Sequence, residues 1–216
     1  MTGAALPQPP TMDEARNYRL AVPWSWMTGV SDEVVDALNL LARGLPEIDL
    51  PPRETIWDAA ATVTIAEGLQ VHAAWLRSAS ELYGDDVRAL LGSGFDIRAV
   101  DYLEARQALL TLRSKVQKRL AMVDAIMVPT APTGPPIRGE APLALRRHLT
   151  GWTRPFNVSD SAVVSIPLPG TSSPISIQIV SNGDSSALSV ALYVERILAE
   201  AGRIVALHGG FHGRGR

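Results

Sequence analysis

Arginine and histidine side chains gather in one stretch of this sequence, LRRHLTGW at residues 145–152, and directly after it. Arg146, Arg147 and His148 lie within the stretch, and Arg154 follows it. Guanidinium groups bind carboxylates and phosphates through paired, charge-assisted hydrogen bonds, so these four side chains form a candidate anion-binding cleft. A solvated basic loop is the more common outcome for such a cluster. An α/β hydrolase or transferase that uses the region of His148 and Arg154 is one hypothesis that the sequence leaves open.

Few other side chains could support nucleophilic or metal chemistry. Cysteine is absent, which excludes disulfides, thiolate nucleophiles and cysteine-ligated metals. His208 and His212 have a spacing that could suit a metal, but the four glycines around them argue against a helix and favour a disordered tail. Ser172 and Ser173 form a tandem serine before a proline, and no G-x-S-x-G motif occurs. We therefore predict no metal site and no cofactor.

Composition restricts the class of protein. The chain has 216 residues, of which 46% are hydrophobic and 19% charged, so it can bury a sizeable core as one large or two small domains. A formal net charge of −2 and an isoelectric point near 6.1 argue against nucleic acid as a partner. The absence of cysteine predicts a cytoplasmic location. Neither a leader peptide nor an apolar run of membrane-spanning length is visible, so we expect no membrane partner.

Hydrophobic periodicity predicts the helices that must position these side chains. Four helices are expected. The first runs from Ser31 or Asp32 to Gly44, the third from Ile97 to Ala121 and the fourth from Asp184 to Gly202. The second runs from the prolines at 51–52 to Tyr83, either unbroken or broken near Gly68. A brief strand and turn at 18–26 should follow a flexible segment at 1–16.

Three strands are expected in the second half of the chain. The apolar runs at 123–129 and 161–167 predict buried strands. Residues 174–180 alternate isoleucine with Ser176, Gln178 and Val180, which predicts a third strand with a side-chain period of two. The prolines between Pro129 and Pro174 predict irregular structure there, with TRPFN at 153–157 as a turn-forming approach to the second strand. This order of elements predicts an α/β or α+β fold.

The same segments resemble the C-terminal part of the amidase signature family. VDAIMVPTAPTGPP carries a D-x-x-x-x-P-T-x-P pattern, TRPFNVSDSAVVSIP a T-x-P-F-N pattern, and PISIQIVSNGDSSALSVALYVE a P-x-x-x-Q strand followed by a turn and a helix. The resemblance extends from about Arg16 to Gly202. It implies a partial amidase-signature-like α/β fold, a mixed β-sheet flanked by helices, with an amidase-like domain at 17–203 and a Gly/Arg-rich tail at 204–216.

The resemblance also implies what chemistry to expect. The family hydrolyses carboxamides with a serine nucleophile, a second serine in a cis peptide and a lysine, and its serines lie in a Gly/Ser-rich loop N-terminal to the segments matched here. This sequence has no loop of that type, and its two lysines, Lys115 and Lys118, fall on the expected long helix. We therefore expect no catalytic residue in the chain and no activity when it is alone. Thr130, Thr153 and Asn157 are the candidates for substrate-pocket or structural roles, with Asn157 expected to be buried.

The resemblance leaves two hypotheses about function, and each implies a different partner. The chain could be the C-terminal segment of a hydrolase, which meets a small carboxamide substrate only if the catalytic half is supplied. It could instead be a non-catalytic binding or assembly module that pairs with another polypeptide. Strands taken from a larger sheet leave an open edge, so we expect a homo-oligomer or a second chain that completes the sheet.

Overall fold

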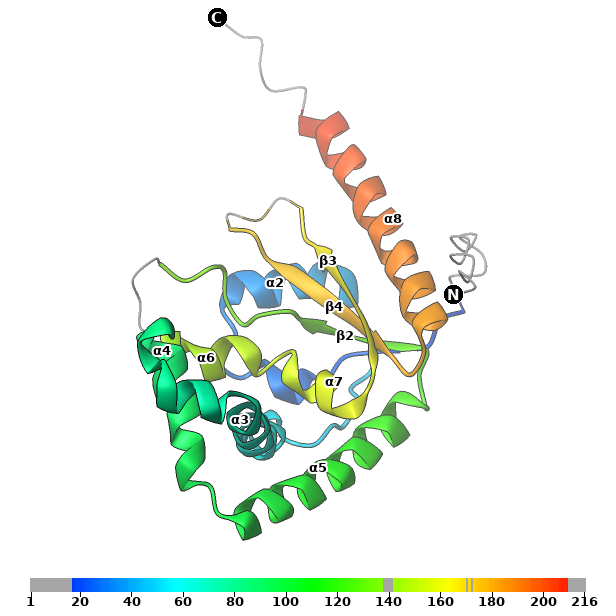
Figure 1. Ribbon diagram of the computed structural model, residues 1–216. Helices are drawn as coiled ribbons and strands as arrows, with labels where there is room; N and C mark the ends of the chain where they lie inside the picture. The colour runs from blue at the N-terminus through cyan, green and yellow to red at the C-terminus, as the bar shows by residue number, and fades with distance from the viewer. Residues whose placement is uncertain (1–16, 138–141, 170, 172, 210–216) are drawn as a thin grey trace, which may run out of the picture. The chain divides into compact units, whose positions relative to one another are not determined.

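The structure is a computed structural model that describes residues 17–137, 142–169, 171 and 173–209 (Figure 1). The chain divides into two compact units, and each is assembled from separate segments of the sequence. Unit 1 comprises Met1–Asp49, Arg119–Pro135 and Ser161–Arg216, and unit 2 comprises Leu50–Lys118 and Pro136–Asp160. The single domain expected at 17–203 stays a prediction.

Unit 1 is built on a mixed four-stranded sheet with the strand order β1-β2-β4-β3. Its strands are β1 (Leu20–Ala21), β2 (Ala125–Pro129), β3 (Ala162–Pro167) and β4 (Ser176–Ser181). β1 pairs with β2 in parallel, with Leu20 opposite Ala125, whereas β4 runs antiparallel to β2 and to β3. The prediction of a mixed sheet flanked by helices is confirmed.

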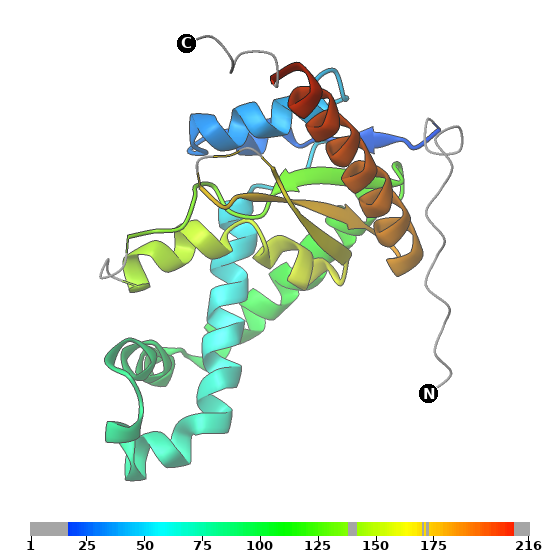
Figure 2. The same cartoon turned by 90° about the horizontal axis from the view of Figure 1, so that it is seen from above.

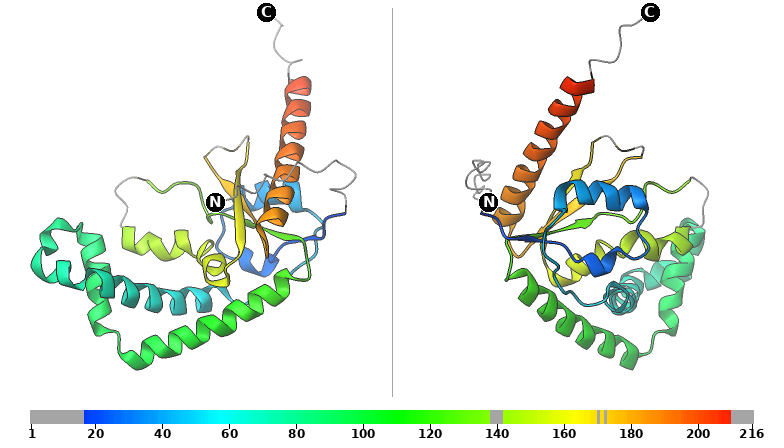
Figure 3. Two further views of the ribbon diagram at one scale, coloured as in Figure 1. Left: turned by 45° about the vertical axis from the view of Figure 1, so that its right-hand side comes forward. Right: turned by 180° about the vertical axis from the view of Figure 1, so that it is seen from behind.

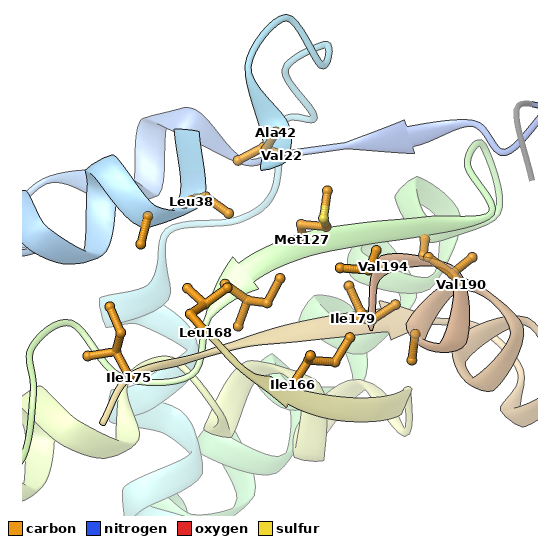
Figure 4. Close-up of a cluster of buried hydrophobic side chains, with 14 of the residues drawn as sticks. Val22, Leu38, Ala42, Met127, Ile166, Leu168, Ile175, Ile179, Val190 and Val194 are labelled. Atoms are coloured by element: carbon orange, nitrogen blue, oxygen red, sulfur yellow. The ribbon is translucent and has the colours of Figure 1, made fainter. Parts of the chain in front are cut away.

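One face of this sheet carries the hydrophobic core of unit 1 (Figure 4). Helices α2 (Asp32–Ala42) and α8 (Asp184–Gly209) both cover this face, as the view from above shows (Figure 2). Each helix presents apolar residues at spacings of three and four, which places them on one side of the helix. The core includes Val34, Leu38 and Ala42 of α2, Val190, Ala191 and Val194 of α8, and Met127, Ile166, Ile177 and Ile179 of the strands.

Burial of the strands differs from the expectation at β3. β2 is buried on both faces, as predicted, and the strand predicted at 174–180 is β4, in which Gln178 and Val180 are buried as well as the isoleucines. The prediction that 161–167 is a buried strand is wrong, because β3 is an edge strand and Ile166 alone among its residues is buried. An edge strand has a neighbour on one side, so its other side stays open.

An ion pair fastens the beginning of β1 to the beginning of β2. The Asp124 carboxylate accepts hydrogen bonds from the Arg19 backbone N–H at 2.7 Å and from Arg19 Nη2 at 3.0 Å. The Asp124 backbone N–H in turn donates to the Arg19 carbonyl at 2.9 Å. Asp124 is the aspartate of the D-x-x-x-x-P pattern, so this residue of the motif has a structural role.

Unit 2 is helical. Its elements are α3 (Arg53–Ser78), the 3-10 turn η2 (Ser80–Leu82), α4 (Asp85–Gly92), the 3-10 turn η3 (Ser93–Asp96), most of α5 (Ala99–Leu120), α6 (Pro142–Thr150) and α7 (Arg154–Ser159). Helix α3 lies between α5 and the α6–α7 pair (Figures 1 and 3). The helix predicted from Ile97 to Ala121 is confirmed as α5, and its buried residues Ala105, Leu112 and Val116 form an apolar stripe at helical spacing.

Several helices of unit 2 are not where the sequence predicts them. α3 ends at Ser78 and not at Tyr83. It continues through Gly68, where the missing side chain leaves room for Leu91 of α4. α6 and α7 occupy much of the stretch expected to be irregular. The expected turn at TRPFN is helix α7 instead, with Pro155 in its first turn, where a missing N–H costs nothing.

Helix α8 continues past its predicted end. It runs through Gly202 to Gly209, so the predicted end at Gly202 is wrong. A glycine inside a helix costs about 1 kcal/mol relative to alanine, so a single glycine does not by itself end a helix. His208 therefore lies within α8, and His212 lies outside the described residues.

Candidate functional site

Three hydroxyl groups form a hydrogen-bonded row at one end of the sheet in unit 1. Thr130 follows β2 directly, and its backbone N–H donates to the Ser176 carbonyl at 2.9 Å. The Thr130 hydroxyl is 3.1 Å from the Ser165 hydroxyl, which donates to the Ser176 hydroxyl at 3.2 Å. Ser165 is exposed, and the other two residues are half-buried. The row can donate to and accept from a polar ligand.

Gln178 supports the strand end that carries this row. Its side chain is on β4 and is 2% exposed, and its amide Nε2 donates to the Pro129 carbonyl at 2.9 Å. Gln178 is the glutamine of the P-x-x-x-Q pattern. The bond fixes the last residue of β2 and thereby the position of Thr130.

No base activates these hydroxyls in the described part of unit 1. Among the described residues the hydrogen bonds of these hydroxyls join them to one another, and none goes to a histidine or lysine. A serine or threonine needs such a base to become a nucleophile. Of the tandem serines, Ser173 donates to the Glu33 carboxylate of α2 at 3.1 Å, and Ser172 lies outside the described residues.

A cavity of 610 Å³ lies elsewhere in unit 1, between α2, the segment after β3 and α8. Leu40, Leu168 and Leu198 contribute apolar surface to it, and Glu33 and Asp36 contribute carboxylates. None of the residues predicted to form a site lines this cavity.

Unit 2 contains a cluster of arginines arranged around two tryptophans. Trp57, in the second turn of α3, donates its indole N–H to the Thr150 hydroxyl at 3.0 Å. The guanidinium carbons of Arg147 and Arg154 each lie 5.0 Å from the centre of the Trp57 ring. Guanidinium groups at this distance are attracted by the negative face of an indole. Trp57 therefore holds two of the four residues predicted to bind an anion.

Arg53 and Trp152 form the second part of the same cluster. The Arg53 guanidinium carbon lies 4.1 Å from the Trp152 ring centre, and Trp152 is 1% exposed. Arg53 was not among the predicted site residues, because in the sequence it is a single arginine at the start of a helix. Its pairing with a tryptophan about one hundred residues later is a tertiary contact that no local pattern predicts.

Acidic side chains lie beside two arginines of this cluster. Asp58 forms an ion pair with Arg147 at 3.1 Å, and Glu54 lies 3.7 Å from Arg53. Burial lowers the pKa of Arg53, and the charge of Glu54 opposes that shift. Burial also lowers the pKa of Arg154, and the nearby charge of Arg146 lowers it further. Within the described residues, Nη1 of Arg154 is buried and has no hydrogen-bond partner.

The remaining predicted residues are not gathered into this cluster. His148 is exposed near the end of α6. The Thr153 hydroxyl donates to the Thr150 carbonyl at 3.4 Å, so Thr153 supports the connection between α6 and α7. Asn157 is exposed on α7, and the prediction of a buried Asn157 is wrong. Whether Thr130, Thr153 or Asn157 contacts a substrate stays a prediction.

The described residues offer neither a metal-binding cluster nor a membrane-spanning helix. No group of three or more histidine or acidic side chains in the described part of the chain could hold a metal ion. Among the described helices, none is both long and apolar enough to cross a membrane.

The chain is similar in sequence to amidases. A family model described as Amidase matches residues 16–186. An amidase of Pseudomonas putida is 32% identical over 98 residues, which make up 45% of this chain and 21% of that protein. The provisionally assigned amidase AmiD of Mycobacterium tuberculosis is 25% identical over 211 residues, which make up 91% of this chain and 42% of AmiD.

Solved structures show the same fold. A crystal structure of an amidase superposes with a TM-score of 0.75 at 24% identity and covers 83% of this chain and 45% of that one. A bacterial aryl acylamidase of the amidase signature family superposes with a TM-score of 0.66 at 18% identity, covering 92% of this chain and 46% of the acylamidase. The chain therefore spans less than half the length of these proteins.

Proposed function

Because this chain belongs to the amidase family, we propose that it is the C-terminal segment of an amidase-signature carboxamide hydrolase and is inactive when it is alone. The segment would supply the sheet end with its hydroxyl row, and the nucleophile would come from a catalytic half that precedes it in the family. A small carboxamide is then a substrate only when that half is present.

The placement of the lysines is the observation that carries this proposal. A lysine that relays a proton from a serine must be neutral near pH 7, and burial or a neighbouring positive charge brings that about. The sequence has two lysines, Lys115 and Lys118, and both are exposed on α5. Neither position suits a proton-relaying lysine, which supports the view that this chain does not contain the Ser-Ser-Lys triad.

A labelling experiment tests this proposal. The purified chain should neither hydrolyse simple amides or esters nor react with a fluorophosphonate probe, and an intact amidase treated in parallel should react. Co-expression with a segment that carries a Gly/Ser-rich amidase loop should restore labelling, on a serine of the added segment. Stoichiometric labelling of a serine in this chain would refute the proposal.

The open edge of the sheet favours a second candidate function, a non-catalytic assembly module. Among the described residues β3 pairs with β4 and with no other strand, and Val163 is 39% exposed on it. Open edges pair readily with further strands. A homo-oligomer or a second chain that completes the sheet is the partner this proposal requires. A cytoplasmic location, which the absence of cysteine favours, stays a prediction.

A further inference from the structure

We propose that unit 2 binds a compact oxyanion, the carboxylate or phosphate group of a small molecule, through Arg154 together with Arg146 and Arg53. This site is separate from the hydroxyl row of unit 1 and does not depend on the hydrolytic function proposed above.

The first observation is a charged donor that the described residues leave unused. Nη1 of Arg154 is shielded from solvent and makes no hydrogen bond within the described part of the chain. A buried donor without an acceptor costs about 1 to 3 kcal/mol, and more when the group is charged. Most buried polar groups in native proteins have a partner, so such a donor indicates an acceptor that binds there. An oxyanion supplies that acceptor and the opposite charge together.

The second observation is the excess of positive charge. Arg146, Arg147 and Arg154 bring three positive charges together, and Asp58 forms an ion pair with Arg147. The Asp58 carboxylate points to solvent, with its side chain 58% exposed. Exposed acids screen a half-buried guanidinium weakly. A bound anion would compensate the charge of Arg154, which Asp58 does not.

The third observation is that the donors are held in place before a ligand arrives. The Trp57 ring contacts the guanidinium of Arg154, and the Trp57 N–H is itself fixed by Thr150. Trp152 holds Arg53 in the same way. Arg53 is also the first residue of α3, a helix of 26 residues whose N-terminal N–H groups attract negative charge. Fixed donors lose little entropy on binding.

The rival explanation is that the cluster is purely structural and that cation–π contacts alone account for the arginines. The two explanations differ in what a free anion does. If the cluster is purely structural, phosphate screens its charges in the same way as any other salt and does not saturate. If the cluster is a binding site, phosphate binding saturates at a defined stoichiometry.

A titration at constant ionic strength separates them. Inorganic phosphate and, in a second arm, succinate are added to the chain in place of potassium chloride, and binding is followed by calorimetry and by tryptophan fluorescence. We expect one site per chain. Arg154→Met should weaken binding about 10-fold or more, which corresponds to the loss of a charge-assisted hydrogen bond. Arg154→Lys keeps the positive charge but loses the planar guanidinium group with its paired N–H donors, so it should weaken anion binding less than Arg154→Met does.

The control is Arg88→Met, in the same unit, which removes an arginine already paired with Asp85 on the surface. It should bind as the wild type does. Circular dichroism shows whether Arg154→Met is folded, and Arg146→Met replaces it if it is not. The proposal is wrong if neither anion saturates, or if the folded variants of Arg154 and Arg146 bind as tightly as Arg88→Met. The anion that binds more tightly, inorganic phosphate or succinate, shows whether the natural ligand carries a phosphate or a carboxylate group.

Discussion

Two amide side chains from amidase-like motifs have opposite environments. Gln178 is buried and bonded to the Pro129 carbonyl, whereas Asn157 is exposed on α7. Removing a buried hydrogen-bond partner leaves the other group unpaired, so Gln178→Ala should lower the free energy of unfolding by about 1 to 3 kcal/mol. Asn157→Ala should change it by no more than about 0.5 kcal/mol. Urea denaturation of both variants checks this, and equal losses would contradict the assignment of roles.

Trp57 is the residue on which the arginine cluster of unit 2 depends. Trp57→Phe removes the hydrogen bond to Thr150 and reduces the ring face that contacts Arg147 and Arg154. We expect a loss of about 1 to 3 kcal/mol in unfolding free energy. Trp75→Phe is the matched control, because Trp75 is on the same helix but 58% exposed, and it should have little effect. Thermal unfolding of the two variants should therefore differ clearly, and coincident curves would argue against a central role for Trp57.

At the scale of elements, the ion pair between β1 and β2 makes part of the stability depend on pH. The hydrogen bonds from Arg19 lower the pKa of the Asp124 carboxyl in the folded chain. A carboxyl with a depressed folded pKa stabilises the fold above its unfolded pKa, about 3.9, and that stabilisation is lost as the pH falls through the folded value.

Replacing either partner should remove this dependence. Asp124→Asn and Arg19→Met are each expected to be less stable than the wild type at neutral pH, and the difference should shrink below about pH 4. Urea midpoints measured from pH 7 to pH 2.5 give the comparison. If the difference between wild type and Asp124→Asn is the same at both ends, the ion pair contributes nothing to the folded state.

Elements were predictable from sequence where a pattern is local. Apolar residues at helical spacing identify α5, and capping residues identify the start of α2. A short continuous apolar run identifies β2 as a strand buried on both faces. The short helices α6 and α7 were not predictable, since the prolines around them are typical of irregular structure.

The candidate site was predictable only in part, for the same reason. Arg146, Arg147 and Arg154 stand close together in the sequence. The pairing of Arg53 with Trp152 and the burial of Gln178 depend on segments distant in the chain, and no local signal indicates them. Asn157 was predicted to be buried and is exposed, because its place in a sequence motif does not indicate which side of a helix faces solvent.

At the scale of the whole molecule, the open side of β3 predicts association. Val163 lies on this edge strand, and no lysine or arginine in β3 discourages pairing. We expect the purified chain to form a homodimer or larger assembly, or to be poorly soluble. Val163→Lys should shift it toward the monomer, and Ser114→Lys, at an exposed position of α5, should not. Light scattering after size exclusion measures both, and a monodisperse wild-type monomer of 23.2 kDa that binds no hydrophobic dye would contradict the prediction.

The parallel pairing of β1 with β2 also has a consequence for how the chain is made. Arg19 and Asp124, which begin the two strands, are 105 residues apart. At a translation rate of about 5 to 20 residues per second, β1 leaves the ribosome roughly 5 to 20 s before its neighbour. β4, an interior strand, is the last of the four to be made. Throughout that interval Val22 and Leu38 have no sheet to cover them, so the nascent chain should be a ligand for ribosome-associated chaperones.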